Sequence, residues 1–151
     1  MLRVVTGNIL HETRGILVHG VNCQGKMNAG IALDIKKKYP KVLSSYLSMC
    51  DEFERIPGKL LGLVDFVQVS DELIIASAFT QATYGRSDFR YVSYDAIDDC
   101  FYRIKHHAID AKLPVIYPRI GAGLANGNWD IISTIINAHL SPSVDHSLFV
   151  L

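Results

Sequence analysis

A continuous apolar run, Gly15–Val21, is the feature that most constrains the fold of this 151-residue chain. It reads GILVHGV and is interrupted by a single histidine. A strand with one face in water alternates apolar and polar residues, whereas a continuous apolar run is typical of parallel strands covered by helices on both faces. The run therefore predicts an inner strand of a sheet with a helical layer on each side.

Strand and helix patterns alternate along the rest of the chain. Further strands are predicted at Leu2–Thr6, Leu63–Val69, Leu73–Phe79, Pro114–Tyr117 and Ser147–Leu151, and helices at Gly30–Tyr39, Lys41–Phe53 and Trp129–Leu140. One more helix is expected after Ser93, whose hydroxyl would cap it. The two strands around residues 70–72 predict a hairpin. The order predicts an α/β fold with a mixed sheet between helical layers, in a single domain over residues 1–151.

The charges and the cysteines exclude several classes of protein. Lys plus Arg and Asp plus Glu each number 15, so the chain lacks the basic excess of a typical nucleic-acid-binding domain. Cys23, Cys50 and Cys100 form no Cys-x-x-Cys pair, which argues against a disulfide framework and a zinc site. No apolar stretch approaches the roughly 20 residues of a membrane span. We expect a cytoplasmic protein with no metal, no cofactor and no membrane partner.

Two segments share one design, in which an apolar strand leads through a glycine-rich loop into a helix. Gly15–Val21 is followed by Asn22–Gly30, and Pro114–Tyr117 is followed by Arg119–Asn128. Glycine lets backbone N–H groups approach a ligand closely, and a helix start adds free N–H donors and the positive end of the helix dipole. Two such loops facing each other would hold a diphosphate. The alternative is that both are only tight turns.

The first loop also contains part of a nucleotide-binding motif. The segment GVNCQGK, from Gly20 to Lys26, matches the glycine and lysine spacing of a nucleoside-triphosphate-binding loop and follows a strand. The next residue is Met27, however, and not the Ser or Thr whose hydroxyl holds Mg²⁺. Nucleoside-triphosphate hydrolysis is therefore disfavoured.

Five landmarks follow one another in a recognisable order. They are Gly7-Asn8-Ile9-Leu10, His19-Gly20-Val21-Asn22-Cys23, Met27-Asn28-Ala29-Gly30-Ile31-Ala32, Pro118-Arg119-Ile120-Gly121-Ala122-Gly123-Leu124 and Trp129. Together they resemble the macrodomain family, in the branch that contains terminal ADP-ribose glycohydrolases, DNA ADP-ribosyl glycohydrolases and fungal-type ADP-ribose 1″-phosphate phosphatases. The resemblance covers nearly the whole chain. It implies a three-layer α/β/α fold with a central mixed sheet that binds ADP-ribose.

The resemblance also implies which residues contact the ligand. Asn8 and Ile9 would lie near the adenine, Asn22 would lie near the distal ribose, and the diphosphate would lie between the two glycine-rich loops. The full set expected on this ground is Asn8, Ile9, Asn22, Met27, Ala29, Gly30, Ile31, Thr80, Ile120, Gly121, Ala122, Gly123 and Leu124. The family also places an aromatic residue near the ligand, for which Phe79, Tyr84 and Phe89 are the candidates here.

For catalysis, the resemblance points to His19 and Asn22. The 1″-phosphatase members have a histidine at this strand-end position, and histidine exchanges protons near neutral pH. His19 would act as acid or base on the phosphate of ADP-ribose 1″-phosphate, and Asn22 would position the ribose. The alternative for a lone histidine in an apolar strand is a core residue whose ring nitrogens are bonded by its neighbours.

Two departures from the family pattern bear on the reaction. Glycohydrolases of this branch carry a catalytic lysine where this chain has Gln81, and an amide cannot form a Schiff base with an opened ribose. Some of them also use an aspartate where this chain has Ala125. We therefore expect a hydrolase that removes the phosphate of ADP-ribose 1″-phosphate. Two alternatives stay open: a non-catalytic reader of ADP-ribose or of ADP-ribosylated macromolecules, and an enzyme that removes ADP-ribose from protein or nucleic acid.

Overall fold

The computed structural model describes residues 2–151 and contains a six-stranded sheet in the order β1-β6-β5-β2-β4-β3. The strands are β1 (Leu2–Thr6), β2 (Gly15–Asn22), β3 (Val64–Gln68), β4 (Leu73–Gln81), β5 (Val115–Tyr117) and β6 (His146–Val150). Neighbouring strands are parallel throughout, except that β3 and β4 form an antiparallel hairpin. The predicted mixed sheet is confirmed.

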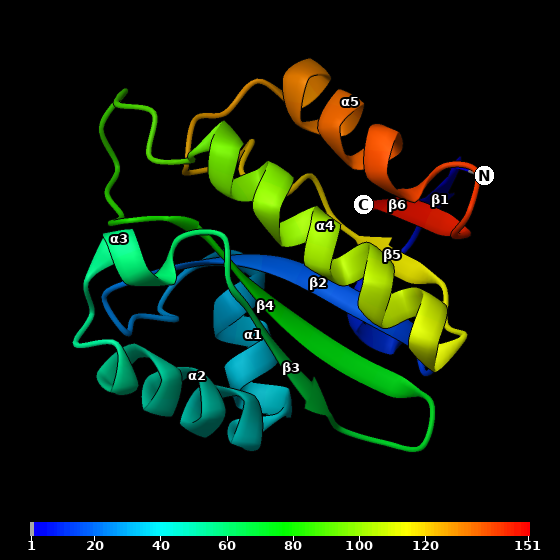
Figure 1. Cartoon of the computed structure of the whole chain (residues 1–151), viewed down its shortest axis with the longest axis horizontal. Helices are drawn as coiled ribbons and strands as arrows, with labels where there is room; N and C mark the ends of the chain where they lie inside the picture. Colours follow the sequence, from blue (N-terminus) through cyan, green and yellow to red (C-terminus); the bar gives the residue numbers. More distant parts are fainter. Residues whose placement is uncertain (1) are drawn as a thin grey trace.

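Helices cover both faces of this sheet. They are α1 (Gly30–Lys38), α2 (Pro40–Glu52), α3 (Pro57–Leu60), α4 (Tyr94–Ala111) and α5 (Trp129–Leu140). Figure 1 shows α1 and α2 beneath the sheet and α4 and α5 above it, which is the predicted three-layer α/β/α arrangement. Within residues 2–151, no helix is long and apolar enough to cross a membrane.

Strand β2 holds the two helical layers together. Its side chains alternate between two apolar clusters: Ile16 and Val18 pack with the α4 and α5 side, and Leu17 and Val21 pack with the α1 and α2 side. All four are buried. Burying an aliphatic side chain contributes about 1.5–3 kcal/mol, so a strand with apolar residues on both faces is strongly fixed in register.

The helix ends follow the local sequence signals. Ser93 caps α4 as predicted, because its hydroxyl accepts a hydrogen bond from the backbone N–H of Ala96 at 3.1 Å. Helix α1 ends at Lys38 and α2 begins at Pro40, so the proline both stops one helix and starts the next. A proline at the first position of a helix costs nothing, since that N–H has no partner within the helix.

Several short elements differ from the sequence expectation. Strand β4 continues two residues beyond Phe79, to Gln81, and β5 begins one residue late, at Val115. The 3₁₀ turn Ile9–His11 and helix α3 were not expected from the sequence. A turn of three or four residues is shorter than one full helical repeat of the apolar pattern, so periodicity gives no signal for it.

Because five of the strands are parallel, their carboxyl ends meet at one edge of the sheet. The loops that follow β2, β4 and β5 therefore gather there, at the left of Figure 1. Ligand sites in open α/β sheets lie at this edge.

Candidate functional site

A cleft of about 540 Å³ opens at the carboxyl edge of the sheet. The loop after β2 forms one wall, the loop after β5 forms the opposite wall, and the segment after β4 forms a third. The lining residues are Gly20, Val21, Asn22, Lys26, Asn28, Ala29, Gly30, Ile31, Ala32, Gln81, Tyr84, Gly85, Arg86, Pro118, Arg119, Ile120, Gly121, Gly123, Leu124 and Ala125. The two glycine-rich loops seen in the sequence thus face each other across the cleft.

Helix α2 holds the loop after β2 in place through hydrogen bonds of Tyr46. The buried hydroxyl of Tyr46 lies 2.6 Å from the backbone oxygen of Asn22 and 3.0 Å from its side-chain oxygen, and it accepts a hydrogen bond from the N–H of Gly25 at 3.1 Å. The Asn22 amide also donates to the carbonyl of Lys26 at 2.9 Å and accepts from the N–H of Gln24 at 2.9 Å. Asn22 therefore shapes its own loop with the polar atoms of its side chain.

The loop after β5 folds back on itself. The N–H of Gly127 donates to the carbonyl of Gly121 at 2.7 Å. Gly121 has a φ of +75°, and a Cβ at this position would lie 2.8 Å from a methyl carbon of Val92. Only glycine combines this left-handed backbone with this close approach. The loop ends at Asn128, whose side chain caps α5 through the N–H of Asp130 at 2.8 Å.

The floor of the cleft depends on Gly20. A Cβ at this position would lie 2.7 Å from the hydroxyl oxygen of Thr80 and 3.3 Å from a methyl carbon of Ile120. The pairing of β2 with β4 also shifts register between Val21 and Asn22, so that Asn22 lies opposite Gln81. Such irregularities re-aim side chains at strand ends, and this one places Gln81 in the cleft wall.

The electrostatics of the cleft are one-sided. Its charged side chains are Lys26, Arg86 and Arg119, and no Asp, Glu or His lines it in the part of the chain that the structure describes. None of the three cations forms a side-chain hydrogen bond or an ion pair with another residue in the range 2–151. The chain as a whole is neutral. Unpaired cations beside a helix start favour an anionic ligand.

The structure brings eight of the expected site residues together in the cleft lining. They are Asn22, Ala29, Gly30, Ile31, Ile120, Gly121, Gly123 and Leu124. Among the three aromatic candidates, Tyr84 lies in the lining, Phe79 is buried in the core and Phe89 is exposed outside the lining. Helix α1 begins only at Gly30, four residues after Lys26. In a nucleoside-triphosphate-binding loop the helix would already have begun, so the structure agrees with the prediction that this segment is not such a loop.

The remaining expected residues lie outside the lining. Asn8 is exposed and caps the 3₁₀ turn by accepting from the N–H of Leu10 at 3.0 Å. Ile9 and Met27 are buried in the core cluster on the α1 and α2 side. Thr80 is fully buried beneath Gly20, and Ala122 is half-buried in its loop.

The structure does not bring His19 to the cleft. Its side chain is fully buried, and its Nε2 lies 2.8 Å from the hydroxyl of Ser77 on the paired strand β4. Burial lowers the pKa of the His19 imidazole to about 3, so the ring is neutral at physiological pH. This geometry places His19 in the core, but only Nε2 has a hydrogen-bond partner, and the buried Nδ1 has none within residues 2–151. The ring does not line the cleft.

Sequence reasoning missed the cations of the cleft. In the sequence, Lys26 stands out only as part of a nucleotide-binding motif, and Arg86 lies in a loop without a regular pattern. Arg119 stands inside the second glycine-rich loop, next to Ile120. The signal that was present is adjacency: Lys26 follows Gly25 and Arg86 follows Gly85, and a cation beside a loop glycine is a common partner of phosphate.

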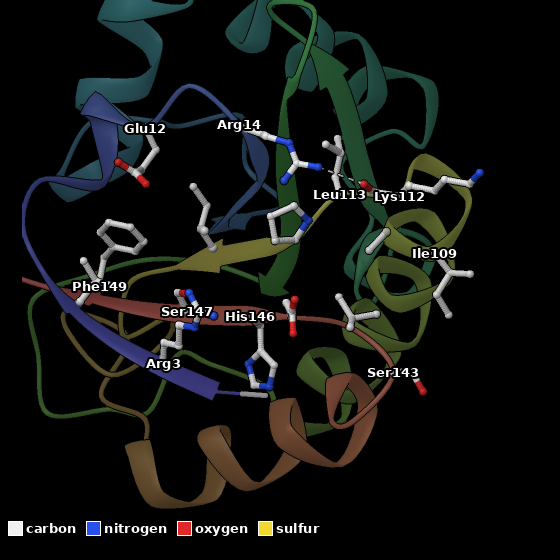
Figure 2. A pocket seen from close by; sticks show the side chains of 16 residues that line it. Arg3, Glu12, Arg14, Ile109, Lys112, Leu113, Ser143, His146, Ser147 and Phe149 are labelled. Carbon is white, nitrogen blue, oxygen red and sulfur yellow. Dashed lines mark hydrogen bonds between the residues drawn. The ribbon is translucent and has the colours of Figure 1, made fainter.

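A second cavity, of about 660 Å³, lies at the opposite, amino-terminal ends of β5 and β6. Figure 2 shows Arg3 on β1 beside Ser147 on β6, with Phe149 farther along β6. Its charges are mixed, since Arg3, Arg14 and Lys112 share it with Glu12 and Asp145, and Arg14 is paired with Glu72 at 2.9 Å. Its position and its mixed charge make it a weaker candidate than the cleft.

Comparison with known proteins finds sequence similarity to proteins named ADP-ribose 1″-phosphate phosphatase and DNA ADP-ribosyl glycohydrolase. No protein-family model matches it. It is 28% identical over 153 residues to the ADP-ribose 1″-phosphate phosphatase of Meyerozyma guilliermondii, covering 82% of this chain and 83% of that protein. It is also 28% identical over 152 residues to the DNA ADP-ribosyl glycohydrolase of Mycobacterium tuberculosis, covering 99% of this chain but only 42% of that protein. The chain thus spans less than half of the glycohydrolase.

Comparison with solved structures gives the fold. The macrodomain of Mycobacterium tuberculosis DarG superimposes with a TM-score of 0.83 at 23% identity, covering 100% of this chain and 98% of that one. Agreement at this level over the full length of both chains assigns the whole three-layer arrangement.

Replacing His19 by glutamine should flatten the dependence of stability on pH. The folded-state pKa of about 3 lies below the unfolded value of 6.5, so the unfolded state binds more protons between these limits. The free energy of unfolding therefore falls as pH drops from 6.5 toward 3, by up to about 1.4 kcal/mol per pH unit from this group. Glutamine can still bond Ser77 but does not titrate. Urea unfolding at a series of pH values measures the slope, and an unchanged slope in His19→Gln would contradict this assignment.

Proposed function

We propose that this chain, which has the macrodomain fold, binds ADP-ribose in the cleft and hydrolyses ADP-ribose 1″-phosphate. The observation that carries the proposal is the pairing of two facing glycine-rich loops with three unpaired cations in a cleft without a carboxylate among its described residues. A diphosphate fits such a site, because it carries two negative charges and many acceptor oxygens. The name of the Meyerozyma guilliermondii relative supports the choice of substrate.

The proposed pose follows the order of the strands. Gly30 and Ile31 at the start of α1, and Gly121 to Leu124 opposite them, would hold the diphosphate. β1 lies on the β5 side of β2, and β4 lies on the other side. Asn8 and Ile9, just after β1, would therefore mark the adenine end, and the segment after β4 would meet the distal ribose.

The proposed reaction adds one water to ADP-ribose 1″-phosphate. The water oxygen attacks phosphorus, the bond between phosphorus and the ribose oxygen breaks, and ADP-ribose and inorganic phosphate are released. Phosphoryl transfer depends mainly on positioning and on stabilising charge on the phosphoryl oxygens. Lys26, Arg86 and Arg119 could supply that positive charge. His19 would act only by supporting β2, since its buried ring makes no contact with the cleft.

A second candidate is a non-catalytic reader of ADP-ribose or of ADP-ribosylated macromolecules. The absence of histidine and carboxylate from the cleft lining, within residues 2–151, favours it, because no ordinary general base stands beside the ligand. Removal of ADP-ribose from protein or nucleic acid is less well supported, although the Mycobacterium tuberculosis relative is named a DNA ADP-ribosyl glycohydrolase. Gln81 and Ala125 occupy the positions where the resemblance implies catalytic groups, and both line the cleft.

We also propose a cytoplasmic location. Cys23, Cys50 and Cys100 are all free and buried. Burial raises the pKa of the Cys23 and Cys100 thiols to about 12. Free thiols of this kind are ordinary in a reducing compartment, which supports the proposal.

ADP-ribose should bind more tightly than AMP, by about tenfold or more. ADP-ribose can engage both loops and the wall after β4, whereas AMP has one phosphate and no distal ribose. Isothermal titration calorimetry measures both dissociation constants at the same ionic strength. Equal affinities would contradict the arrangement in which both loops hold the diphosphate.

Gly123→Glu should abolish ADP-ribose binding and any release of phosphate from ADP-ribose 1″-phosphate. The new carboxylate would enter a site built for anions and repel the ligand. Gly123→Ala is the matched control, because a Cβ at this position has no heavy atom within 4 Å, and it should bind as the wild type does. Phosphate release by the wild type tests the reaction itself. Binding without release would establish the reader, and normal binding by a folded Gly123→Glu would overturn the site.

Gln81→Lys alone should not produce an enzyme that removes ADP-ribose from modified DNA or protein. The lysine would lie in the cleft wall, but residue 125 would still be alanine, so no carboxylate would assist. Release of ADP-ribose from an ADP-ribosylated oligonucleotide and from an ADP-ribosylated peptide measures the outcome. A large gain over the wild type would contradict this prediction, because it would show that the lysine is the only group that the chain lacks for this activity.

A further inference from the structure

The loop of residues 82–91 carries Tyr84 and Arg86 into the cleft. It is held by the side chain of Asn126, from the loop after β5, and we call this contact the Asn126 clasp. The side-chain amide of Asn126 donates to the carbonyl of Ser87 at 2.7 Å and to the carbonyl of Phe89 at 2.8 Å. Asn126 has a φ of +61°, a left-handed conformation that asparagine tolerates better than most residues. The loop after β5 thus holds the loop after β4 in place.

Further contacts close this clasp. The N–H of Tyr91 donates to the carbonyl of Ala125 at 2.9 Å, and the hydroxyls of Ser87 and Tyr91 lie 2.6 Å apart. Gly85 packs directly against the Tyr91 hydroxyl, since a Cβ at Gly85 would lie only 2.1 Å from that oxygen. The backbone immediately before Arg86 is therefore fixed on one side by the clasp and on the other by β4.

The two arginines of this loop have different surroundings. Arg90 places its guanidinium 4.3 Å from the centre of the Tyr94 ring, which is a cation–π contact on α4. Arg86 lies in the cleft lining and has no hydrogen-bond or ion-pair partner within residues 2–151. The backbone of this loop is thus held by five contacts, and the Arg86 guanidinium keeps all its N–H donors free within residues 2–151. Such an arginine can donate hydrogen bonds to an anion.

The position of Arg86 along the cleft decides which anion it would meet. The sheet order places β4 beyond β2, on the side away from β5 and β1. If the diphosphate lies between the loops after β2 and β5, the loop after β4 lies past the diphosphate, at the distal ribose. The group that distinguishes ADP-ribose 1″-phosphate from ADP-ribose is the phosphate on that ribose.

We propose that Arg86, held by the Asn126 clasp, is the residue that recognises the 1″-phosphate and so distinguishes the substrate from ADP-ribose. This inference rests on the proposed function of the cleft. Its planar guanidinium would donate two hydrogen bonds to the phosphate oxygens. Asn126 acts as a positioning residue, because it contacts the loop and is not part of the lining.

The test compares two ligands in matched variants of one loop. Arg86→Gln should weaken binding of ADP-ribose 1″-phosphate, measured as KM or as the calorimetric Kd where no turnover occurs, by about tenfold or more. The Kd of ADP-ribose should change by less than about threefold, since that ligand lacks the recognised phosphate. Arg90→Gln is the control, because it removes the other arginine of the loop and should leave the ratio of the two affinities unchanged. Arg86→Lys should restore part of the preference, because it keeps the charge but not the fork of donors.

A second variant tests the clasp. Asn126→Asp keeps the size of the side chain and tolerates the left-handed backbone, but its carboxylate repels the two carbonyls that the amide binds. It should shift the ratio of affinities in the same direction as Arg86→Gln and speed hydrogen exchange of the amides at residues 84–90.

Three outcomes separate the inference from the function on which it rests. If the wild type does not bind ADP-ribose, the proposed function fails and the inference falls with it. If the wild type binds ADP-ribose but Arg86→Gln weakens both ligands equally, or neither, the inference is overturned and the proposed function stands. A change in the ratio in Arg90→Gln as large as that in Arg86→Gln would likewise overturn it, because general loop disruption would then explain both.

Discussion

The parallel pairing of β2 with both β4 and β5 determines where the cleft lies. Apolar side chains on both faces of β2 fix its register against two helical layers. Because the strands run in one direction, the loops that leave them must emerge at the same edge. Gly20 at the end of β2 then leaves the space that a Cβ would fill, and Tyr46 anchors the loop that follows. The site is thus a consequence of strand direction, supported by a few specific contacts.

Charge is distributed unevenly over a chain that is neutral as a whole. Three cations without partners within residues 2–151 face the cleft, while the second cavity has both cations and acidic residues in its lining. A cation without a partner contributes little to the stability of the folded protein, since an exposed charge is already well solvated. Such a cation contributes to ligand binding, because its attraction to a bound anion offsets the cost of removing that anion from water. This asymmetry is the strongest physical reason to treat the cleft as an anion site.

The architecture and the two facing loops could be predicted from the sequence, because apolar runs, glycine-rich loops and a capping serine are local signals. Gly30 and Gly123 were expected at the site and line the cleft. The role of His19 depended on which face of β2 it occupies and on how deeply it is covered, and both are set by tertiary packing. Arg86 could not be predicted either. It reaches the cleft through the clasp of Asn126, a contact between segments 37 and 39 residues apart in the sequence, and local patterns do not report such pairings.

The most direct test of the central claim is a crystal structure of this chain with ADP-ribose. We predict electron density for the diphosphate between the start of α1 at Gly30 and the loop from Gly121 to Leu124, with the distal ribose toward Gln81 and Arg86. Density for the ligand confined to the cavity of Figure 2, or an empty cleft at a saturating concentration of ADP-ribose, would contradict the account.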